Sequence, residues 1–296
     1  MLPVVLAHGY LGFASLGRVD YFDHIIPLLK RLGAPDVFAP TVDPKGSLHD
    51  RASELMSKIK QAFPGAKVHV IAHSMGGLDA RFMLSKAGLN GSGLVDTLTT
   101  LGTPHQGTIL ADLAVLNLNG AASGSIRDML RRVAAGIPRL TGRSLLGISL
   151  ATLDEIRTTL QTLSEIGSGI AAGDFSGVRA YARGVFNLDD HALGELTTVS
   201  CRGRFPVDQS DVPNTQCTSY AGIAEWPRLT PFLTLAHLIL LAHDGPNDGL
   251  VPLASATLQH IHQATISTDH IGLIGHRPED VTPHYTQIMS TLRARS

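Results

Sequence analysis

A single serine between an apolar run and a helical segment limits what this chain can fold into. Residues 68–71 read V-H-V-I and predict a short buried strand, and residues 76–87 predict the helix that follows it. Ser74 lies between them in A-H-S-M-G, with Ala72 and Gly76 two places to either side. A sharp strand-to-helix turn admits only small side chains at those two positions. Because such a turn lifts the serine hydroxyl above the sheet and directs helix N–H groups at a developing oxyanion, Ser74 is predicted to be a nucleophile.

An early H-G turn supports this prediction. Residues 2–7 predict a buried strand, and His8 and Gly9 follow it directly. An oxyanion hole needs two N–H donors aimed at one point, and loss of one donor typically slows a reaction roughly 100- to 1,000-fold. The residue after the nucleophile supplies one donor, and a loop after an early strand supplies the other. We therefore expect Met75 and Tyr10 to form the oxyanion hole.

In enzymes with this elbow, the acid and the base follow the serine in the order Ser, Asp, His. Two aspartates compete, Asp244 in H-D-G and Asp248 in N-D-G-L-V-P. We favour Asp248, because the apolar residues after it anchor its loop. His270 is the predicted base, since it follows the strand-like residues 263–269 and precedes a flexible I-G pair. Asp248 would hold the tautomer of His270, which acts as general base and then as general acid.

The remaining histidines nearby are interpreted as surface or hydrogen-bonded side chains: His260, His262, His276 and His284. A His-x-His pair such as 260–262 can chelate zinc or nickel, but a metal site needs three or four converging ligands. No cysteine or carboxylate supports the pair within its own segment. The sequence therefore predicts no metal site.

Strand and helix patterns alternate over the first hundred residues, which is typical of a parallel sheet with right-handed crossovers. At about residues 107–185 short apolar helical faces alternate with glycine-rich joints. We expect a single domain over residues 1–296 with a helical lid or cap inserted at about 107–185. Such a lid would line or cover an acyl groove until a lipid surface draws it aside, and the alternative is a permanently packed subdomain. Residues 187–216 predict a polar loop, and residues 283–293 predict a closing helix.

Five motifs in order resemble those of the bacterial true lipases, the triacylglycerol lipases of the Pseudomonas–Burkholderia–Proteus group. They are H-G-Y-L-G at 8–12, A-H-S-M-G-G at 72–77, G-T-P-H-Q-G at 102–107, S-Y-A-G at 219–222 and N-D-G-L-V at 247–251. The resemblance implies an α/β-hydrolase fold, with a mostly parallel central sheet between helices. It also implies a catalytic triad of Ser74, Asp248 and His270, with Tyr10 and Met75 as the oxyanion donors.

Two departures from that family matter. Its members usually bind a structural calcium ion through an aspartate two residues after the catalytic histidine, and here that position is Gly272. The second acidic ligand, about twenty residues before the catalytic aspartate, is replaced by W-P-R at 226–228. Because calcium needs several oxygen ligands, preferably charged, we expect the site to be missing and the chain to need no cofactor. The disulfide that many members carry after the aspartate cannot form, since Ala254 and Ser255 occupy that region.

Composition excludes several partners. The formal net charge is −1 and aromatic residues make up 5%, which gives no indication of nucleic acid or of an electrostatic membrane partner. No apolar run approaches the roughly 18 residues of a membrane span, and residues 233–242 predict a buried helix. We therefore expect a monomer that meets a lipid or other ester substrate, in part at a lipid–water interface.

Cys201 and Cys217 flank a polar loop, and this arrangement favours a disulfide. Closing a loop of about fifteen residues would stabilise the fold by roughly 3 kcal/mol in the chain-entropy model. A disulfide indicates an exported protein, whereas two separate thiols would fit a cytoplasmic enzyme. No secretory leader is evident before the first strand, so we expect a secreted protein if the sequence is a mature form and a cytoplasmic one otherwise.

These observations predict a serine carboxylic-ester hydrolase, with a lipase that cleaves triacylglycerols through an acyl-enzyme on Ser74 as the leading interpretation. A short-chain carboxylesterase, a phospholipase or a thioesterase would use the same triad, and the elbow does not distinguish them. A non-catalytic binding protein with this fold is the remote alternative, because it would be expected to lack a triad member.

Overall fold

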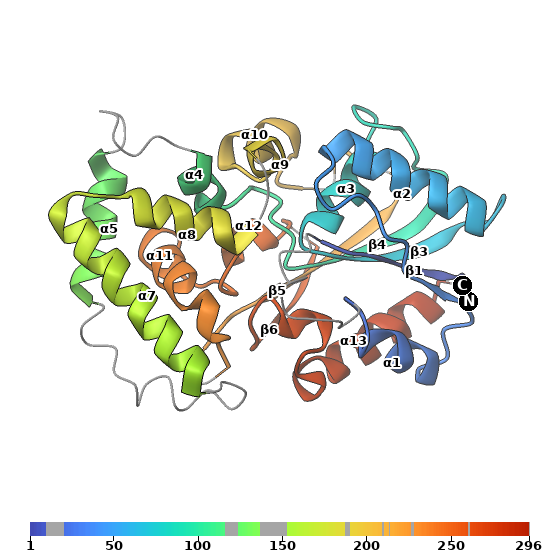
Figure 1. Ribbon diagram of the computed structural model, residues 1–296. Coiled ribbons are helices and arrows are strands. Elements are labelled where there is room, and N and C mark those ends of the chain that lie inside the picture. The colour runs from blue at the N-terminus through green and yellow to red at the C-terminus, as the bar shows by residue number, and fades with distance from the viewer. Residues whose placement is uncertain are drawn as a thin grey trace.

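Six parallel strands form one sheet at the centre of the molecule (Figure 1). The computed structural model describes residues 1–9, 21–115, 124–136, 153–186, 190–208, 210–212, 214–225, 228–259 and 261–295. The strand order is β2-β1-β3-β4-β5-β6, and every neighbouring pair is parallel, as the alternating pattern predicts. The strands are β1 (Val4–Ala7), β2 (Val37–Phe38), β3 (Val68–His73), β4 (Val95–Leu101), β5 (Gln216–Gly222) and β6 (His262–Ile266).

Two pairs of helices cover the two faces of this sheet (Figure 1). They are α1 (Ile25–Arg31) with α13 (Pro278–Arg293), and α2 (Leu48–Ala62) with α3 (Met75–Leu84). Alternate side chains of a strand point to opposite faces, so Leu6 packs in the cluster of α1 and α13 and Val5 in that of α2 and α3. Burial on both faces explains why β1 reads as a continuous apolar run.

Six helices lie in the described parts of the chain between β4 and β5. They are α4 (Ile109–Val115), α5 (Gly124–Gly136), α7 (Leu153–Ala172), α8 (Ser176–Phe186), α9 (Asp190–Glu195) and α10 (Thr198–Arg204). Four of these helices, α4, α5, α7 and α8, fall within the predicted insertion, whose boundaries and lid role remain predictions. Within the described residues, no helix combines the length and the apolar character that crossing a membrane requires.

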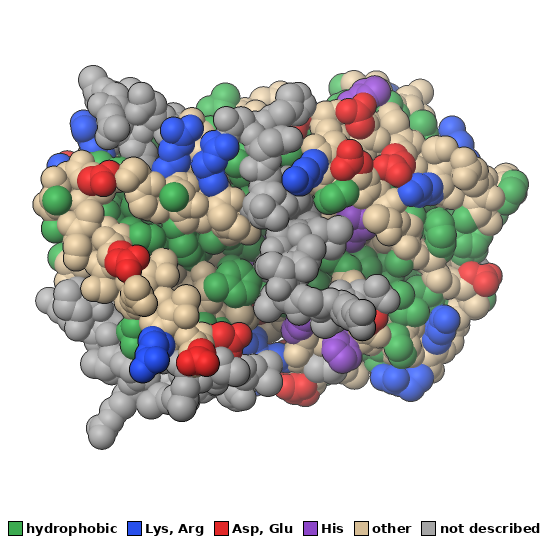
Figure 2. Space-filling view, in the orientation of Figure 1, with side chains coloured by type: hydrophobic (Ala, Val, Ile, Leu, Met, Phe, Trp, Pro, Cys, Tyr) green, Lys and Arg blue, Asp and Glu red, His purple; other side chains and the backbone are tan. Residues whose placement is uncertain are grey.

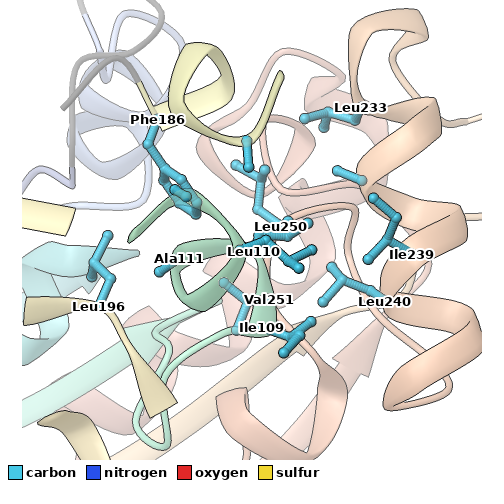
Figure 3. Packing of buried hydrophobic residues seen from close by; sticks show 14 of the residues in the cluster. Ile109, Leu110, Ala111, Phe186, Leu196, Leu233, Ile239, Leu240, Leu250 and Val251 are labelled. Carbon is cyan, nitrogen blue, oxygen red and sulfur yellow. The ribbon is translucent and has the colours of Figure 1, made fainter. Parts of the chain in front are cut away.

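The core of these helices extends to the loop that carries Asp248. After β5 the chain forms η4 (Pro231–Leu233), α11 (Thr234–His243), α12 (Leu253–Ala256) and η5 (Gly272–Ile274). Leu250 and Val251 pack in one buried cluster with Leu110 of α4 and Leu240 of α11 (Figure 3). The apolar residues after Asp248 therefore anchor its loop, as the sequence predicts.

Two of the predicted elements are wrong. Residues 187–216 were expected to form a polar loop, but α9 and α10 lie there. The Thr197 side chain caps α10 by accepting a hydrogen bond from Ser200 N, a local signal within a polar and glycine-containing segment. The closing helix begins at Pro278 rather than at Pro283, because Pro278 occupies the favoured first-turn position and acidic residues follow it.

The expected disulfide between Cys201 and Cys217 is also wrong. Cys201 belongs to α10 and donates to the carbonyl of Glu195 at 3.3 Å, whereas Cys217 belongs to β5 and donates to the carbonyl of Thr215 at 3.7 Å. The two thiols lie in different hydrophobic clusters. Burial raises the pKa of each thiol to about 12. The prediction failed because it treated the segment of Cys201 as part of a loop closed by a disulfide. That segment is a helix, and Cys201 packs in a different hydrophobic cluster from Cys217.

Candidate active site

Ser74 lies at the predicted junction, between the last residue of β3 and the first residue of α3. Its backbone has φ 54° and ψ −132°, a conformation that costs a residue with a side chain about 1–3 kcal/mol. A Cβ added to Gly76 would lie 2.5 Å from the carbonyl oxygen of Ala7 and 2.6 Å from that of His8. The end of β1 therefore imposes the small residue that the sequence shows at position 76.

The H-G turn lies directly over the serine. A Cβ added to Gly9 would be 2.6 Å from Ser74 Cβ. Met75 is buried and opens α3, so its N–H has no acceptor within the helix. The other predicted oxyanion donor, Tyr10, lies outside the described residues, as do His260, Trp226 and Pro227 from the sequence predictions.

Asp248 and His270 form a buried pair. Asp248 Oδ2 lies 2.7 Å from His270 Nδ1, and neither side chain is more than 2% exposed. The other oxygen of Asp248 accepts from the N–H groups of Leu250 and Val251 at 3.0 and 2.7 Å. The competing Asp244 instead lies 3.0 Å from His243 Nδ1. Because Nδ1–H donates to the carboxylate, His270 Nε2 remains an acceptor in the neutral ring.

The end of β4 brings this pair next to the elbow. Ser74 N–H donates to the carbonyl of Leu101 at 2.9 Å. A Cβ added to the next residue, Gly102, would lie 2.9 Å from Asp248 Oδ2 and 3.3 Å from His270 Nδ1, and Gly102 has a φ of +55°. Although both residues are described, no hydrogen bond joins the side chains of Ser74 and His270. Such contacts often tighten only when substrate binds.

Buried polar groups that sequence reasoning missed hold the H-G turn. His8 Nε2 accepts from Val42 N–H at 2.9 Å, and its Nδ1 donates to the carbonyl of Gly9 at 2.6 Å. Burial lowers the pKa of His8 to about 4, so the ring is neutral at pH 7. Arg51 donates to the carbonyl of His8 at 3.2 Å and pairs with the buried Asp79 at 2.6 Å.

His73 was also missed as a site residue. It is fully buried, and its ring centroid lies 4.5 Å from that of His270. Burial, and then the nearby His270, hold the pKa of His73 well below its usual range. Its sequence signal was a polar side chain at the end of a mostly apolar strand, next to the predicted nucleophile.

Hydrogen-bond donors and guanidinium groups occupy the region where the resemblance implies a calcium ion. Asp269 Oδ2 accepts from the N–H and the hydroxyl of Thr230 at 2.7 and 2.5 Å, and its Oδ1 accepts from Gly272 N–H at 2.8 Å. Arg277 lies 3.5 Å from Asp269 and donates to the carbonyl of Arg228. Because donors and a cation already surround the carboxylate, these residues do not fit a calcium ion.

A cavity of about 400 Å³ lies beside α7. Apolar and aromatic side chains of α7, α8, η4 and α11 form much of its wall, including Leu163, Tyr181, Phe232 and Leu235. Thr230 lies on the same wall and bonds to Asp269, the residue before His270. On the face shown in Figure 2, hydrophobic side chains gather in a hollow beside α7. An apolar cavity therefore adjoins the segment that carries the predicted base.

Curated relatives confirm the resemblance drawn from the motifs. A triacylglycerol lipase of Vibrio cholerae is 29% identical over 282 residues, which cover 92% of this chain and 80% of the relative. A triacylglycerol lipase of Pseudomonas fragi is 25% identical over 295 residues, with 93% and 88% covered. A shorter match, to a triacylglycerol lipase of Burkholderia plantarii, is 38% identical over 120 residues and covers 37% and 31%.

Solved structures share the fold at lower identity. The mature form of a Bacillus licheniformis lipase superposes with a TM-score of 0.62 and 18% identity, covering 97% of this chain and 91% of that one. The Staphylococcus hyicus lipase gives a TM-score of 0.57 and 17% identity, covering 98% and 95%. Residues 3–154, just over half of the chain, match the family model described as alpha/beta hydrolase fold. Together with the parallel sheet and the serine elbow, this match establishes that the chain belongs to the α/β-hydrolase family.

Proposed function

We propose that this chain is a serine carboxylic-ester hydrolase that cleaves acylglycerols through an acyl-enzyme on Ser74. One observation carries the proposal: Asp248 and His270, joined at 2.7 Å in the interior, lie beside a serine in a strained strand-to-helix turn. A strained serine and a buried carboxylate–histidine pair are both typical of active sites, and the strain itself destabilises the fold.

Each residue has a defined role in this mechanism. Ser74 Oγ attacks the ester carbonyl carbon while His270 Nε2 takes the hydroxyl proton, and Asp248 stabilises the imidazolium through Nδ1–H. The N–H groups of Met75 and Tyr10 would bind the oxyanion. His270 then protonates the leaving alcohol, which departs and leaves the acyl group on Ser74. A water molecule, deprotonated by His270, attacks that acyl group and releases the carboxylic acid.

The substrate class rests on the relatives and on the cavity. The relatives from Vibrio cholerae and Pseudomonas fragi are named triacylglycerol lipases. A cavity of about 400 Å³ whose wall is largely apolar, although Asp154 and Glu155 also line it, suits the hydrocarbon part of a lipid ester. The helical insertion would shield the reaction from water, and a lipid surface would draw its apolar faces away.

We further propose that the enzyme needs no metal ion and acts as a monomer. The hydrogen bonds and the guanidinium around Asp269 support the first statement, because they leave that carboxylate no role as a calcium ligand. Support for the second is that few large hydrophobic side chains are exposed within the described residues: Val199, Val207 and Leu241.

A serine-directed phosphonate tests the nucleophile. It should label Ser74 stoichiometrically, and Ser74→Ala should abolish both labelling and ester hydrolysis. Ser85→Ala is the matched control, since Ser85 is a buried serine at the other end of α3 and should be dispensable for both. Labelling at another serine, or full hydrolysis by Ser74→Ala, would show that the assignment is wrong.

Emulsified substrates then separate the candidate activities. A lipase should hydrolyse long-chain triolein emulsions as well as tributyrin, with a rate that rises once substrate exceeds its solubility. A short-chain carboxylesterase would act on tributyrin and on soluble p-nitrophenyl esters and leave triolein intact. That second outcome would retain the serine mechanism and replace the substrate class.

A further inference from the structure

His73 is a buried titratable side chain that the proposed chemistry does not use. It immediately precedes Ser74, and its Nε2 lies 3.0 Å from the backbone carbonyl oxygen of His270. Its Nδ1 lies 2.6 Å from the hydroxyl oxygen of Tyr21, which is 3.1 Å from the backbone nitrogen of Gly9. A hydrogen-bond chain of Gly9, Tyr21, His73 and His270 therefore links the H-G turn to the loop of the predicted base.

The neighbouring groups determine which atom carries the proton in each of these hydrogen bonds. A carbonyl oxygen only accepts, so His73 Nε2 carries a proton and donates it to His270. Burial keeps the pKa of His73 well below its usual range, so the ring is neutral and its Nδ1 accepts. Tyr21 must then donate its hydroxyl proton to His73, which leaves the tyrosine oxygen to accept from Gly9 N–H. One tautomer satisfies every group.

The series of hydrogen bonds fixes the second side of the His270 backbone. The N–H of His270 donates to the carbonyl of Asp248 at 2.8 Å, and the carbonyl of His270 accepts from His73. The backbone of His270 is thus held on both sides, while its ring bonds to the Asp248 carboxylate. At the other end of this hydrogen-bond series, the hydroxyl of Tyr21 accepts from Gly9 N–H, and Gly9 lies against Ser74.

We propose that Tyr21 and His73 are positioning residues, which hold the His270 loop and the H-G turn in register on either side of Ser74. The inference rests on the proposed function for its catalytic meaning, whereas the hydrogen-bond chain can be tested without it. A neutral ring at position 73 also suits the reaction, because a second cation beside His270 would oppose its protonation. Displacement of a reacting group by about 1 Å can cost about 100-fold in rate.

Two variants of similar size separate positioning from packing. His73→Gln keeps a distal amide donor for the His270 carbonyl and an acceptor for Tyr21, whereas His73→Met has no donor and only a weak sulfur acceptor. On a soluble p-nitrophenyl ester, His73→Met should lose about 10- to 100-fold in kcat with little change in KM. His73→Gln should regain most of that loss. Rates are referred to active sites counted by phosphonate titration, so that misfolded protein does not enter the comparison.

His69 supplies the control, because it is a fully buried histidine on the same strand that bonds to Thr97. His69→Met should leave kcat per titrated site unchanged, even if its melting temperature falls. Equal losses in His73→Gln and His73→Met, or an unchanged kcat in His73→Met, would overturn the positioning role.

Nitrogen NMR tests the hydrogen bonds of His73 without any measurement of activity. At pH 7 the ¹⁵N signals of His73 should show a protonated Nε2 and an unprotonated Nδ1. Tyr21→Phe should shift the Nδ1 signal and lower kcat with little change in KM. A protonated Nδ1 in the wild-type protein would refute the chain. If the wild type neither hydrolyses esters nor reacts with the phosphonate, the proposed function fails, and the NMR result alone decides the hydrogen-bond chain.

Discussion

The sheet edge around Ser74 and the core of the helical insertion are both buried, but different forces hold them together. At the sheet edge, His8, His73, Asp248 and His270 are at most 6% exposed, and each bonds to a specific partner. In the insertion, Leu130 packs in a buried hydrophobic cluster that extends to Leu250 and Val251 after Asp248. The first region depends on hydrogen-bond geometry and the second on removal of apolar surface from water.

This difference predicts how each region responds to change. Hydrogen bonds weaken steeply when their angle or distance shifts, and a buried polar group without a partner is costly. Apolar contacts have no preferred direction, so a helix can shift and repack with a smaller loss. Substitutions at the sheet edge should therefore impair chemistry, whereas substitutions in the insertion core should impair stability.

The largest expected effect is on turnover and arises at the sheet edge. Asp248→Asn should lower kcat by about four orders of magnitude, because the amide no longer stabilises the His270 imidazolium. Asn keeps an acceptor for Leu250 and Val251, so the fold should survive. Asp244→Asn is the control and should stay within about twofold of wild type, since Asp244 contacts His243 instead. Steady-state kinetics on a soluble ester decide between the two aspartates, and the reverse result would exchange their roles.

In the insertion core the main effect should be on stability. Leu130 is fully buried in α5, so Leu130→Ala should lower the free energy of unfolding by about 2–5 kcal/mol. Turnover per titrated active site should change by no more than a few fold. Val199→Ala, at an 81% exposed side chain of α10, should leave both unchanged. Urea unfolding and active-site titration measure the two quantities, and a tenfold fall in turnover per site would erase the contrast between the regions.

Acid should weaken the sheet edge through its neutral histidines. The pKa of His8 is about 4 in the folded protein against 6.5 without burial, so between these values the unfolded chain binds a proton that the folded protein does not. Stability should therefore fall as the pH drops from about 6.5 towards 4. His8→Gln keeps an acceptor and a donor and should reduce that loss by about 3 kcal/mol. Urea unfolding at pH 7, 5 and 4 gives the free energy of unfolding at each pH for both proteins. An equal fall with decreasing pH in the wild type and in His8→Gln would contradict this origin.

Metal removal should have the smallest effect of all. Excess chelator is expected to leave both the melting temperature and the activity unchanged, because Thr230, Gly272 and Arg277 already surround Asp269. Thermal unfolding with and without chelator checks this expectation. A melting temperature several degrees lower in chelator, restored by calcium, would show that the sheet edge depends on an ion as well as on its own hydrogen bonds.

Local patterns in the sequence predicted the parallel sheet, the turn at Ser74 and the preference for Asp248 over Asp244. Each of these depends on neighbouring residues: alternation along a strand, small side chains beside a sharp turn, and apolar residues that anchor a loop. Local reasoning failed where the segment had weak patterns, as in α10, and where a pair of cysteines suggested a bridge that the fold does not make.

The sequence by itself predicted the alternation of strands and helices over the first hundred residues and that Ser74, Asp248 and His270 meet at the carboxyl edge of the sheet, because parallel strands bring successive strand ends to one edge. Only the tertiary structure decided how that edge is held. Tyr21 is 52 positions from His73, and His73 is 197 positions from His270. No local pattern links residues so far apart, and their hydrogen bonds exist only after the strands and helices have packed and excluded water from between them.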